Sequence, residues 1–325
     1  MITRRQSIAL LGGTAAASLT LAGCARKPPR KDVVFATQKN GVPFLAQTRG
    51  DFAKRLERRG IGPVTWVEFA SGPPLIEAIR AGAVDIGLVG DAPVIYALAA
   101  DTDFHYVAAQ RFPGLVGSGL LVPAGSSVRA LADIKGKRVA YTKGSSSEFA
   151  LAAALRQVGL GLKDIVVANL SPVDGQAALA NGSVDAWAIW DPFFTLAQLQ
   201  GGARKIPLPN SGLDTVSYYV ASGAFVRDRA ETLRATLDEL RVEAAWGNGH
   251  RDFYRDQVAK ATRLPPQVLD GMIAQYKDFL FAVDPVTPAI IANEQKVGDY
   301  LFEAGVIPKK IDAAKAAWTD WTPAP

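Results

Sequence analysis

Cysteine and histidine are scarce in this chain of 325 residues, which has one cysteine and two histidines. A single cysteine excludes both an intrachain disulfide and a Cys-x-x-Cys pair. His105 and His250 lie far apart without the HExxH spacing of a zinc protease, and we expect neither to be catalytic. No P-loop or GxGxxG motif follows a predicted strand. We therefore predict no metal and no cofactor.

The chain also lacks a strong excess of charge. It has 36 Lys and Arg against 31 Asp and Glu, and without Arg4 and Arg5 of the N-terminal segment the net charge falls to +3. No basic stretch interleaved with aromatic residues is present, so we expect no nucleic-acid partner. A composition of 49% hydrophobic and 21% charged residues is typical of a globular protein, and the length suits two lobes.

Residues 1–24 have the pattern of an export signal. Arg4 and Arg5 give a positive start, and Ile8–Leu21 is an apolar run too short to span a membrane. The run ends in Leu21-Ala22-Gly23-Cys24, which resembles a bacterial lipobox, whose cysteine is lipidated. We expect Cys24 to anchor the protein in the cell envelope after twin-arginine or general secretory export. Residues 25–31 are then a basic tether close to anionic lipid.

From residue 32 onward, short apolar runs alternate with segments of helical periodicity. The first block has expected strands at 32–37, 64–69 and 84–89, and expected helices at 44–59, 73–81 and from Gly90 on. Strands that alternate with helices at this spacing predict a parallel sheet with helices on its faces.

The same order of elements returns about a hundred residues later. Ala78-x3-Gly82-x-Val84-Asp85-x5-Asp91 recurs as Ala178-x3-Gly182-x-Val184-Asp185-x5-Asp191, and two more strand–loop–helix units, at 138–151 and 166–179, repeat the first block. Three matched elements in one order predict two similar α/β lobes. We expect Asp85 and Asp185 to shape the turns into their strands and to have no ligand role.

Two unmatched segments, Leu115–Val122 and Thr215–Ala221, have strand composition and are expected to cross between the lobes. The part from Asp228 to Trp318 is helical and has no repeat partner, so we expect it to pack on the first lobe. Its expected helices are 231–246, 253–261, 265–279 and 289–303. The predicted organisation is a first lobe of residues 32–117 and 218–325 and a second lobe of residues 118–217.

The stretch Arg138–Leu155 predicts a strand, a Lys143–Ser147 loop and a helix. A serine there is a good helix N-cap, and Gly144 permits a tight turn. The helix dipole makes such a corner attractive to an anion. Two interpretations stay open, an ordinary capped helix and an anion site.

Loops at the carboxyl ends of parallel strands are where α/β lobes bind ligands. Here these loops are rich in glycine and hydroxyl residues: Gln38-Lys39-Asn40-Gly41, Ala70-Ser71-Gly72, Gly90-Asp91, Gly144-Ser145-Ser146-Ser147 and Trp190-Asp191-Pro192. Backbone N–H groups beside an aromatic wall suit a small organic anion with an apolar tail. Trp190 either covers that tail or belongs to the core, whereas we expect Trp187 in the core.

Five stretches resemble the aliphatic-sulfonate-binding proteins of bacterial ABC importers, a group that includes taurine and nitrate binders. They are Trp66–Pro73, Val89–Pro93, Lys143–Ser147, Ser183–Pro192 and Pro308–Asp312. The resemblance implies an α/β, two-lobe periplasmic binding protein of type II. Such a protein is a monomer that closes on its ligand in the periplasm and delivers it to permease and ATPase subunits.

An aliphatic sulfonate is the expected ligand, with taurine, nitrate or another small anion as the alternative. The expected ligand-binding residues are Gln38, Ser71, Gly72, Gly90, Asp91, Ser145, Ser146, Ser147, Trp190, Asp191 and Tyr218. The family often has small hydroxyl residues where this chain has Leu88-Val89, which predicts a more apolar pocket. A hydrolase that uses Ser146 is a remote alternative, because Glu148 takes the place of the last glycine of G-x-S-x-G. We therefore expect no enzyme.

Overall fold

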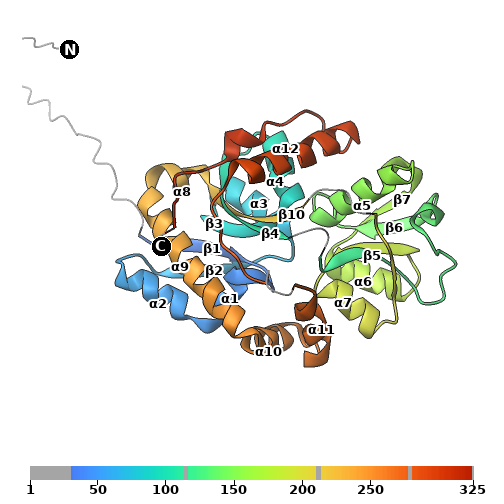
Figure 1. Cartoon of the computed structure of the whole chain (residues 1–325), viewed down its shortest axis with the longest axis horizontal. Helices are drawn as coiled ribbons and strands as arrows, with labels where there is room; N and C mark the ends of the chain where they lie inside the picture. The colour runs from blue at the N-terminus through green and yellow to red at the C-terminus, as the bar shows by residue number, and fades with distance from the viewer. Residues whose placement is uncertain (1–30, 113–115, 210–213, 277–279, 324–325) are drawn as a thin grey trace, which may run out of the picture.

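The computed structural model describes residues 31–112, 116–209, 214–276 and 280–323, which form two α/β lobes side by side (Figure 1). The predicted signal segment 1–24, with Cys24, lies outside the described residues, as does the tether up to residue 30. In the described part of the chain, no helix is both long and apolar enough to cross a membrane.

The first lobe is built on a five-stranded sheet in the order β2-β1-β3-β10-β4. Its strands are β1 (Val33–Thr37), β2 (Val64–Glu68), β3 (Ile86–Gly90), β4 (Phe104–Phe112) and β10 (Thr215–Ser222). β1 is parallel to β2 and β3, whereas β10 runs antiparallel to both β3 and β4.

The second lobe repeats this arrangement in a sheet of order β7-β6-β8-β5-β9. Its strands are β5 (Ser118–Val122), β6 (Arg138–Tyr141), β7 (Val166–Asn169), β8 (Ala186–Trp190) and β9 (Arg204–Ile206). Here β5 is the antiparallel strand, paired with β8 and β9. In each lobe the antiparallel strand is the first one after the chain changes lobe. The predicted two-lobe α/β fold with mostly parallel sheets is confirmed.

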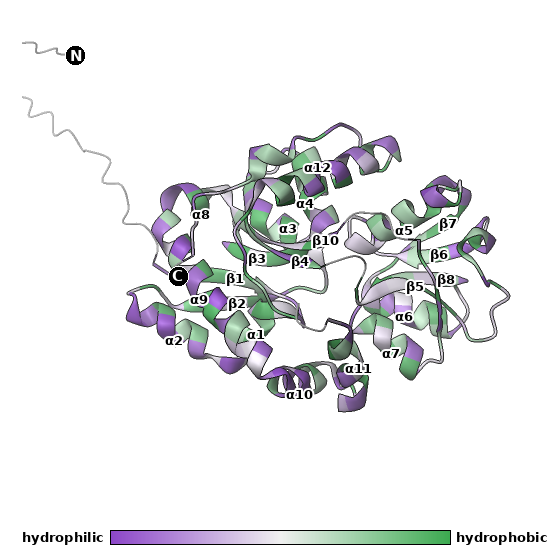
Figure 2. Cartoon of the chain, in the orientation of Figure 1, coloured by the Kyte–Doolittle hydropathy of each residue, from purple (hydrophilic) through white to green (hydrophobic). Residues whose placement is uncertain are grey.

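Helices cover the faces of both sheets, with their green, apolar sides inward in Figure 2. Those of the first lobe are α1 (Gly41–Arg49), α2 (Asp51–Arg58), α3 (Gly72–Arg80), α4 (Asp91–Ala99), α8 (Gly223–Asp228), α9 (Ala230–Gly249), α10 (Arg251–Thr262), α11 (Pro266–Tyr276) and α12 (Pro288–Glu303). Those of the second lobe are α5 (Ser146–Gln157), α6 (Pro172–Ala180) and α7 (Phe193–Leu199).

The single helix predicted at 44–59 is wrong, because the structure has two helices there. Gly50 takes a left-handed φ of 77° and donates its N–H to the carbonyl of Ala46, which ends α1. α2 then begins at Asp51. Strands β4 and β9 are further elements that the sequence reasoning did not predict.

The aspartates of the internal repeat have the same role in both lobes. Oδ2 of Asp85 accepts the N–H of Val34 at 2.8 Å, and Oδ2 of Asp185 accepts the N–H of Arg138 at 2.8 Å. Each carboxylate therefore joins the start of one parallel strand to the start of its neighbour. Asp85 also forms an ion pair with Arg229, and neither aspartate lines the cavity described below.

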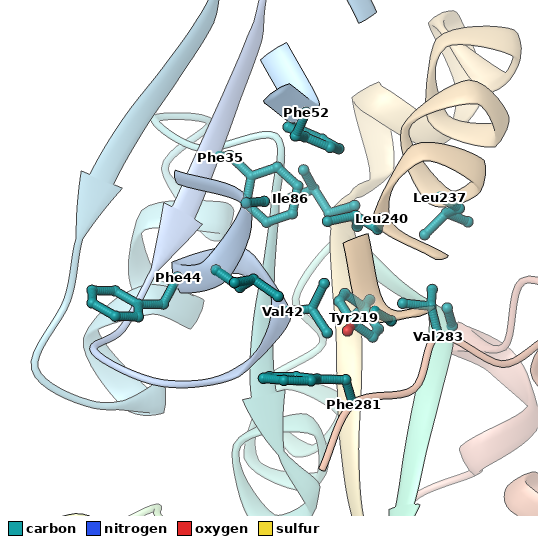
Figure 3. Packing of buried hydrophobic residues seen from close by; sticks show 14 of the residues in the cluster. Phe35, Val42, Phe44, Phe52, Ile86, Tyr219, Leu237, Leu240, Phe281 and Val283 are labelled. Carbon is teal, nitrogen blue, oxygen red and sulfur yellow. The ribbon is translucent and has the colours of Figure 1, made fainter. Parts of the chain in front are cut away.

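The larger core of the first lobe lies between its sheet and α9. Phe35, Ile86 and Tyr219 point from the sheet toward Leu237 and Leu240 of α9 (Figure 3). Beside this core, a buried ion network ties α1 and α2 to α9. Glu243, which is fully buried, accepts hydrogen bonds from Arg49 and Arg55.

The two lobes contact each other through helix α5. Phe149 and Ala153 of α5 share an apolar cluster with Ile95 of α4 and with residues of α12. The hydroxyl of Tyr96 donates to the carboxylate of Glu148 at 2.7 Å across the same contact. Of the C-terminal helices, α9 packs on the first lobe, whereas α12 also contacts α5 and α11 also contacts α7 of the second lobe.

Candidate ligand-binding cleft

A cavity of about 430 Å³ lies between the lobes, at the carboxyl ends of strands from both sheets. Most of the predicted ligand-binding residues line it: Gln38, Gly72, Gly90, Asp91, Ser145, Ser146, Ser147, Trp190 and Asp191. Loops separated by more than a hundred residues are thus brought to one place. Leu88 and Val89 also line the cavity and add the expected apolar wall.

Tyr218 and Ser71 are not among the lining residues. Tyr218 is fully buried in the core, with its ring 5.1 Å from that of Tyr106. Its strand neighbour Ser217 lines the cavity, and successive side chains of a strand point to opposite faces, so Tyr218 points away. Ser71 is buried as the N-cap of α3, next to the lining residue Gly72. The expectation for these two side chains is therefore corrected.

Four helices begin at this cavity, and none of them is capped by a side chain. Their N-cap residues are Asn40, Ser71, Gly90 and Ser145, and no side-chain cap hydrogen bond forms at any of them. Elsewhere the cap does form: Ser171, Ser222 and Thr287 each accept a backbone N–H of their helix. Among the described helices with Asn, Ser or Thr at the N-cap, the bond is missing only where the helix begins at the cavity. At α3 the first-turn prolines Pro73 and Pro74 have no N–H to donate, and at α1 the N–H of Gly41 is donated to the hydroxyl of Tyr254 at 3.0 Å. The start of α5 has no proline, so it is the one that best offers first-turn N–H groups to a ligand.

Ser145 shows why its helix is uncapped. Its hydroxyl donates to the carbonyl of Thr142 at 2.5 Å and lies 2.8 Å from the hydroxyl of Ser147. The hydroxyl oxygen of Ser145 therefore meets a hydroxyl of the first turn of α5 and no backbone N–H of that turn. A helix N-terminus in this state is attractive to an anion.

The starts of α4 and α5, from opposite lobes, touch each other. A Cβ added at Gly90 would lie only 2.0 Å from Oγ of Ser146. The Ser146 hydroxyl lies close enough to the carboxylate of Asp91 to lower its pKa, and Oδ1 of Asp91 accepts the N–H of Ala92 at 2.7 Å. Burial raises the pKa of Asp91 to about 6 although these donors act in the other direction.

The other end of the predicted site is formed by Trp190 and Asp191, at the end of β8. Trp190 is partly buried on the cavity wall, whereas Trp187 is fully buried in the core, as expected. Oδ1 of Asp191 accepts the N–H of Thr195 at 3.0 Å and its hydroxyl at 2.6 Å. Burial raises the pKa of Asp191 to about 6.

Helices α10 and α11 add residues that the sequence reasoning missed. Tyr254, Met272 and Tyr276 line the cavity, and the chain segment that carries them has no repeat partner. Only the strand alternation, which places Thr215 and Ser217 on one face, could have indicated further lining residues.

The lining lacks cationic side chains. None of the described residues that line the cavity is Lys or Arg, while Asp91, Asp191 and Asp214 are present. The described residues also contain no group of three His, Cys, Asp or Glu side chains that could hold a metal ion. An anion in this cavity is therefore held by hydrogen-bond donors and helix dipoles, without a salt bridge to a described lining residue.

Comparison with known proteins gives the family. The NMT1/THI5 like family matches residues 63–246, more than half of the chain. An Escherichia coli (strain K12) protein named as an aliphatic sulfonates-binding protein is 36% identical over 257 residues, which are 78% of this chain and 79% of that protein.

Solved structures agree with this comparison. The alkanesulfonate-binding protein SsuA from Xanthomonas axonopodis pv. citri bound to MOPS has a TM-score of 0.80 and 32% identity, over 89% of this chain and 98% of that one. The desulfurization enzyme DszB shares the fold alone, with a TM-score of 0.63 and 16% identity over 90% of this chain and 97% of that one. The chain belongs to the NMT1/THI5-like family, and its relatives include the aliphatic-sulfonate-binding proteins.

Proposed function

We propose that this protein is the substrate-binding component of an ABC importer and captures an aliphatic sulfonate. The observation that carries the proposal is the convergence of uncapped helix starts from both lobes on one cavity. Each such terminus favours an anion by about 0.3–1 kcal/mol, and more where it is buried. The names of the relatives, alkanesulfonate- and aliphatic-sulfonate-binding proteins, support the same ligand class.

In this proposal the sulfonate lies against the first turn of α5 and is also reached by the start of α4. Three sulfonate oxygens suit several N–H donors at once. The Ser146 hydroxyl adds a donor when it turns from Asp91 to the sulfonate, whereas the Ser147 hydroxyl already donates to Oγ of Ser145. The alkyl tail then lies along Trp190 and the apolar pair Leu88-Val89. Taurine, nitrate or another small anion is the alternative ligand.

Closure of the two lobes follows from where the ligand contacts lie. A ligand that touches α4 in one lobe and α5 in the other binds both only when the lobes are together, so it shifts the population toward the closed form. We place the lobe boundaries near residues 117 and 218, where the chain crosses. The closed, monomeric complex then delivers the sulfonate to the permease and ATPase subunits.

The test is calorimetry with butane-1-sulfonate on the wild-type protein and on Ser146→Asp. A carboxylate at the start of α5 repels the anion and competes for its N–H donors, so binding should be lost. The matched control is Ser171→Asp, since Ser171 begins α6 away from the cavity. Equal binding by Ser146→Asp and wild type would place the anion elsewhere, and no binding of any sulfonate by the wild type would refute the function.

We propose binding without catalysis. Neither histidine is among the described lining residues, so the Ser–His pair of a hydrolase is missing from the described lining, and the titratable group beside the Ser146 hydroxyl is the carboxylate of Asp91. Because DszB shows that this fold also supports an enzyme, a generic ester should be tested directly. Turnover that Ser146→Ala abolishes would support the hydrolase alternative instead.

We also propose that the protein works in the periplasm, anchored by a lipid on Cys24. The support is the lipobox at the end of the apolar run of residues 8–21. The Cys24→Ser variant should then move from the membrane fraction to the soluble envelope fraction. Unchanged membrane fractionation of an exported, cleaved protein would contradict the anchor.

A further inference from the structure

One oxygen of Asp191 is left without a partner at the edge of the cavity. While Oδ1 accepts two hydrogen bonds from Thr195, Oδ2 is buried and has no hydrogen-bond partner among the described residues. The whole residue is only 5% exposed. A buried carboxylate oxygen that lacks a donor is costly, so its presence in a binding cavity indicates that a donor comes from the ligand.

Two other lining residues meet at this oxygen. A Cβ added at Gly117, which has a left-handed φ of 60°, would lie 2.7 Å from Oδ2 of Asp191 and 2.0 Å from the hydroxyl of Tyr276. Glycine at this position therefore lets α11 of the first lobe approach Asp191 of the second. The Tyr276 side chain stands beside the carboxylate and Trp190 lines the same cavity, and the faces of aromatic rings favour a cation.

The other acidic groups of the described lining already have donors. Asp214 forms an ion pair with Arg111, whose Nε lies 2.6 Å from Oδ2. Asp91 has the Ala92 N–H and the Ser146 hydroxyl. Lys205 is close enough to Asp191 to lower its pKa, but the Lys205 ammonium lies over the Phe194 ring, 5.5 Å from the ring centre.

We propose that Oδ2 of Asp191 binds a protonated amine of the ligand, so that the captured molecule is an aminoalkanesulfonate. This inference rests on the proposed function and assigns the second end of the ligand. The sulfonate lies at the helix starts, and the ammonium lies at Asp191, with Trp190 beside the short alkyl chain. A zwitterion also enters a cavity without described cationic side chains more readily than a simple anion, because it brings its own countercharge.

The test compares two ligands of nearly equal shape, 3-aminopropane-1-sulfonate and butane-1-sulfonate, by calorimetry at pH 8. They differ by an ammonium in place of a methyl group. The wild-type protein should bind the aminosulfonate about tenfold more tightly or better. This ratio needs no variant and is therefore independent of any effect on folding.

Asp191→Asn assigns the preference to this side chain. Asparagine keeps an oxygen acceptor for Thr195 and loses the charge, so the ratio should fall to about one or below while butane-1-sulfonate still binds. Asp214→Asn is the matched control, because Asp214 lines the same cavity but has Arg111 as its partner, and its ratio should stay at the wild-type value.

Three outcomes separate the claims. An equal or tighter binding of butane-1-sulfonate by the wild type overturns the inference and leaves the sulfonate function standing. A preference that persists in Asp191→Asn overturns the assignment to Asp191. If neither sulfonate binds the wild type, the proposed function fails and this inference fails with it.

Discussion

The contact between the two helix starts makes Gly90→Ala a direct test of lobe closure. A Cβ at residue 90 would lie 2.0 Å from Oγ and 3.3 Å from Cβ of Ser146, and carbon atoms do not approach other heavy atoms at the first of these distances. The backbone itself tolerates alanine, because Gly90 has an ordinary φ of −78°. The clash therefore exists only when the two lobes are together.

The size of the effect follows from what Ser146 must give up. To make room, its hydroxyl turns away and loses its favourable contact with the carboxylate of Asp91, and its Cβ must still move by a few tenths of an ångström. A hydrogen bond to a charged group contributes about 1.5–3 kcal/mol, which corresponds to an affinity loss of about 10- to 100-fold. The melting temperature of the ligand-free protein should change little if its lobes are apart.

Calorimetry on Gly90→Ala, Ser146→Ala and the double variant measures this loss. Because Ser146→Ala removes Oγ, the added methyl group should cost much less affinity in that background, so the two changes should not be additive. Gly125→Ala is the control, since a Cβ there meets nothing within 4 Å. An undiminished affinity in Gly90→Ala, or a fully additive double variant, would refute the contact as part of the ligand-bound state.

Three further predictions concern the tail, the charge and the scaffold. Trp190→Ala should weaken long alkanesulfonates more than short ones, because each buried methylene contributes about 0.8 kcal/mol; equal losses along the series would remove Trp190 from the tail site. The pKa of Asp91 is raised to about 6, so its carboxylate is charged at pH 8 and repels an anion. Butane-1-sulfonate should therefore bind more tightly at pH 5 than at pH 8, and this difference in affinity should shrink in Asp91→Asn. Glu243→Ala removes the buried partner of Arg49 and one of the two buried partners of Arg55, which keeps Glu239, and should cost about 2–3 kcal/mol in urea unfolding. Glu77→Ala at the exposed Arg80 pair should cost less than about 0.5 kcal/mol.

The internal repeat explains why so much of the fold could be predicted from the sequence. Strand-then-helix units are local patterns, and the recurrence of Asp85 as Asp185 marks the same turn in both lobes. The structure adds what a turn pattern does not contain, namely that each aspartate accepts an N–H near the start of a strand about fifty residues away. Gly50 was missed because a single left-handed residue divides two helices of continuous periodicity.

The sequence indicated which loops reach the cavity, but it did not indicate the direction of individual side chains. Glycines and serines at strand ends identify a helix start without tertiary information, and these residues do line the cavity. Tyr218 needed the strand register, since one residue of shift decides between cavity and core. Tyr254 and Tyr276 come from helices outside the repeat, and only the packing of α11 against α7 brings them to the second lobe.

The electrostatics of the two helix starts indicate why an anion stabilises the closed arrangement. Each helix N-terminus carries the equivalent of about half a positive charge, so the starts of α4 and α5 repel each other when they meet without a countercharge. Asp91 lies at this contact, accepts the N–H of Ala92 and supplies part of that countercharge. A sulfonate between the two starts interacts favourably with both lobes at once, and an open form offers it only one. In the empty protein the starts of α4 and α5 repel each other, and a bound sulfonate attracts both of them. The ligand therefore binds the closed form more tightly than the open form, which is the difference in affinity that lobe closure requires.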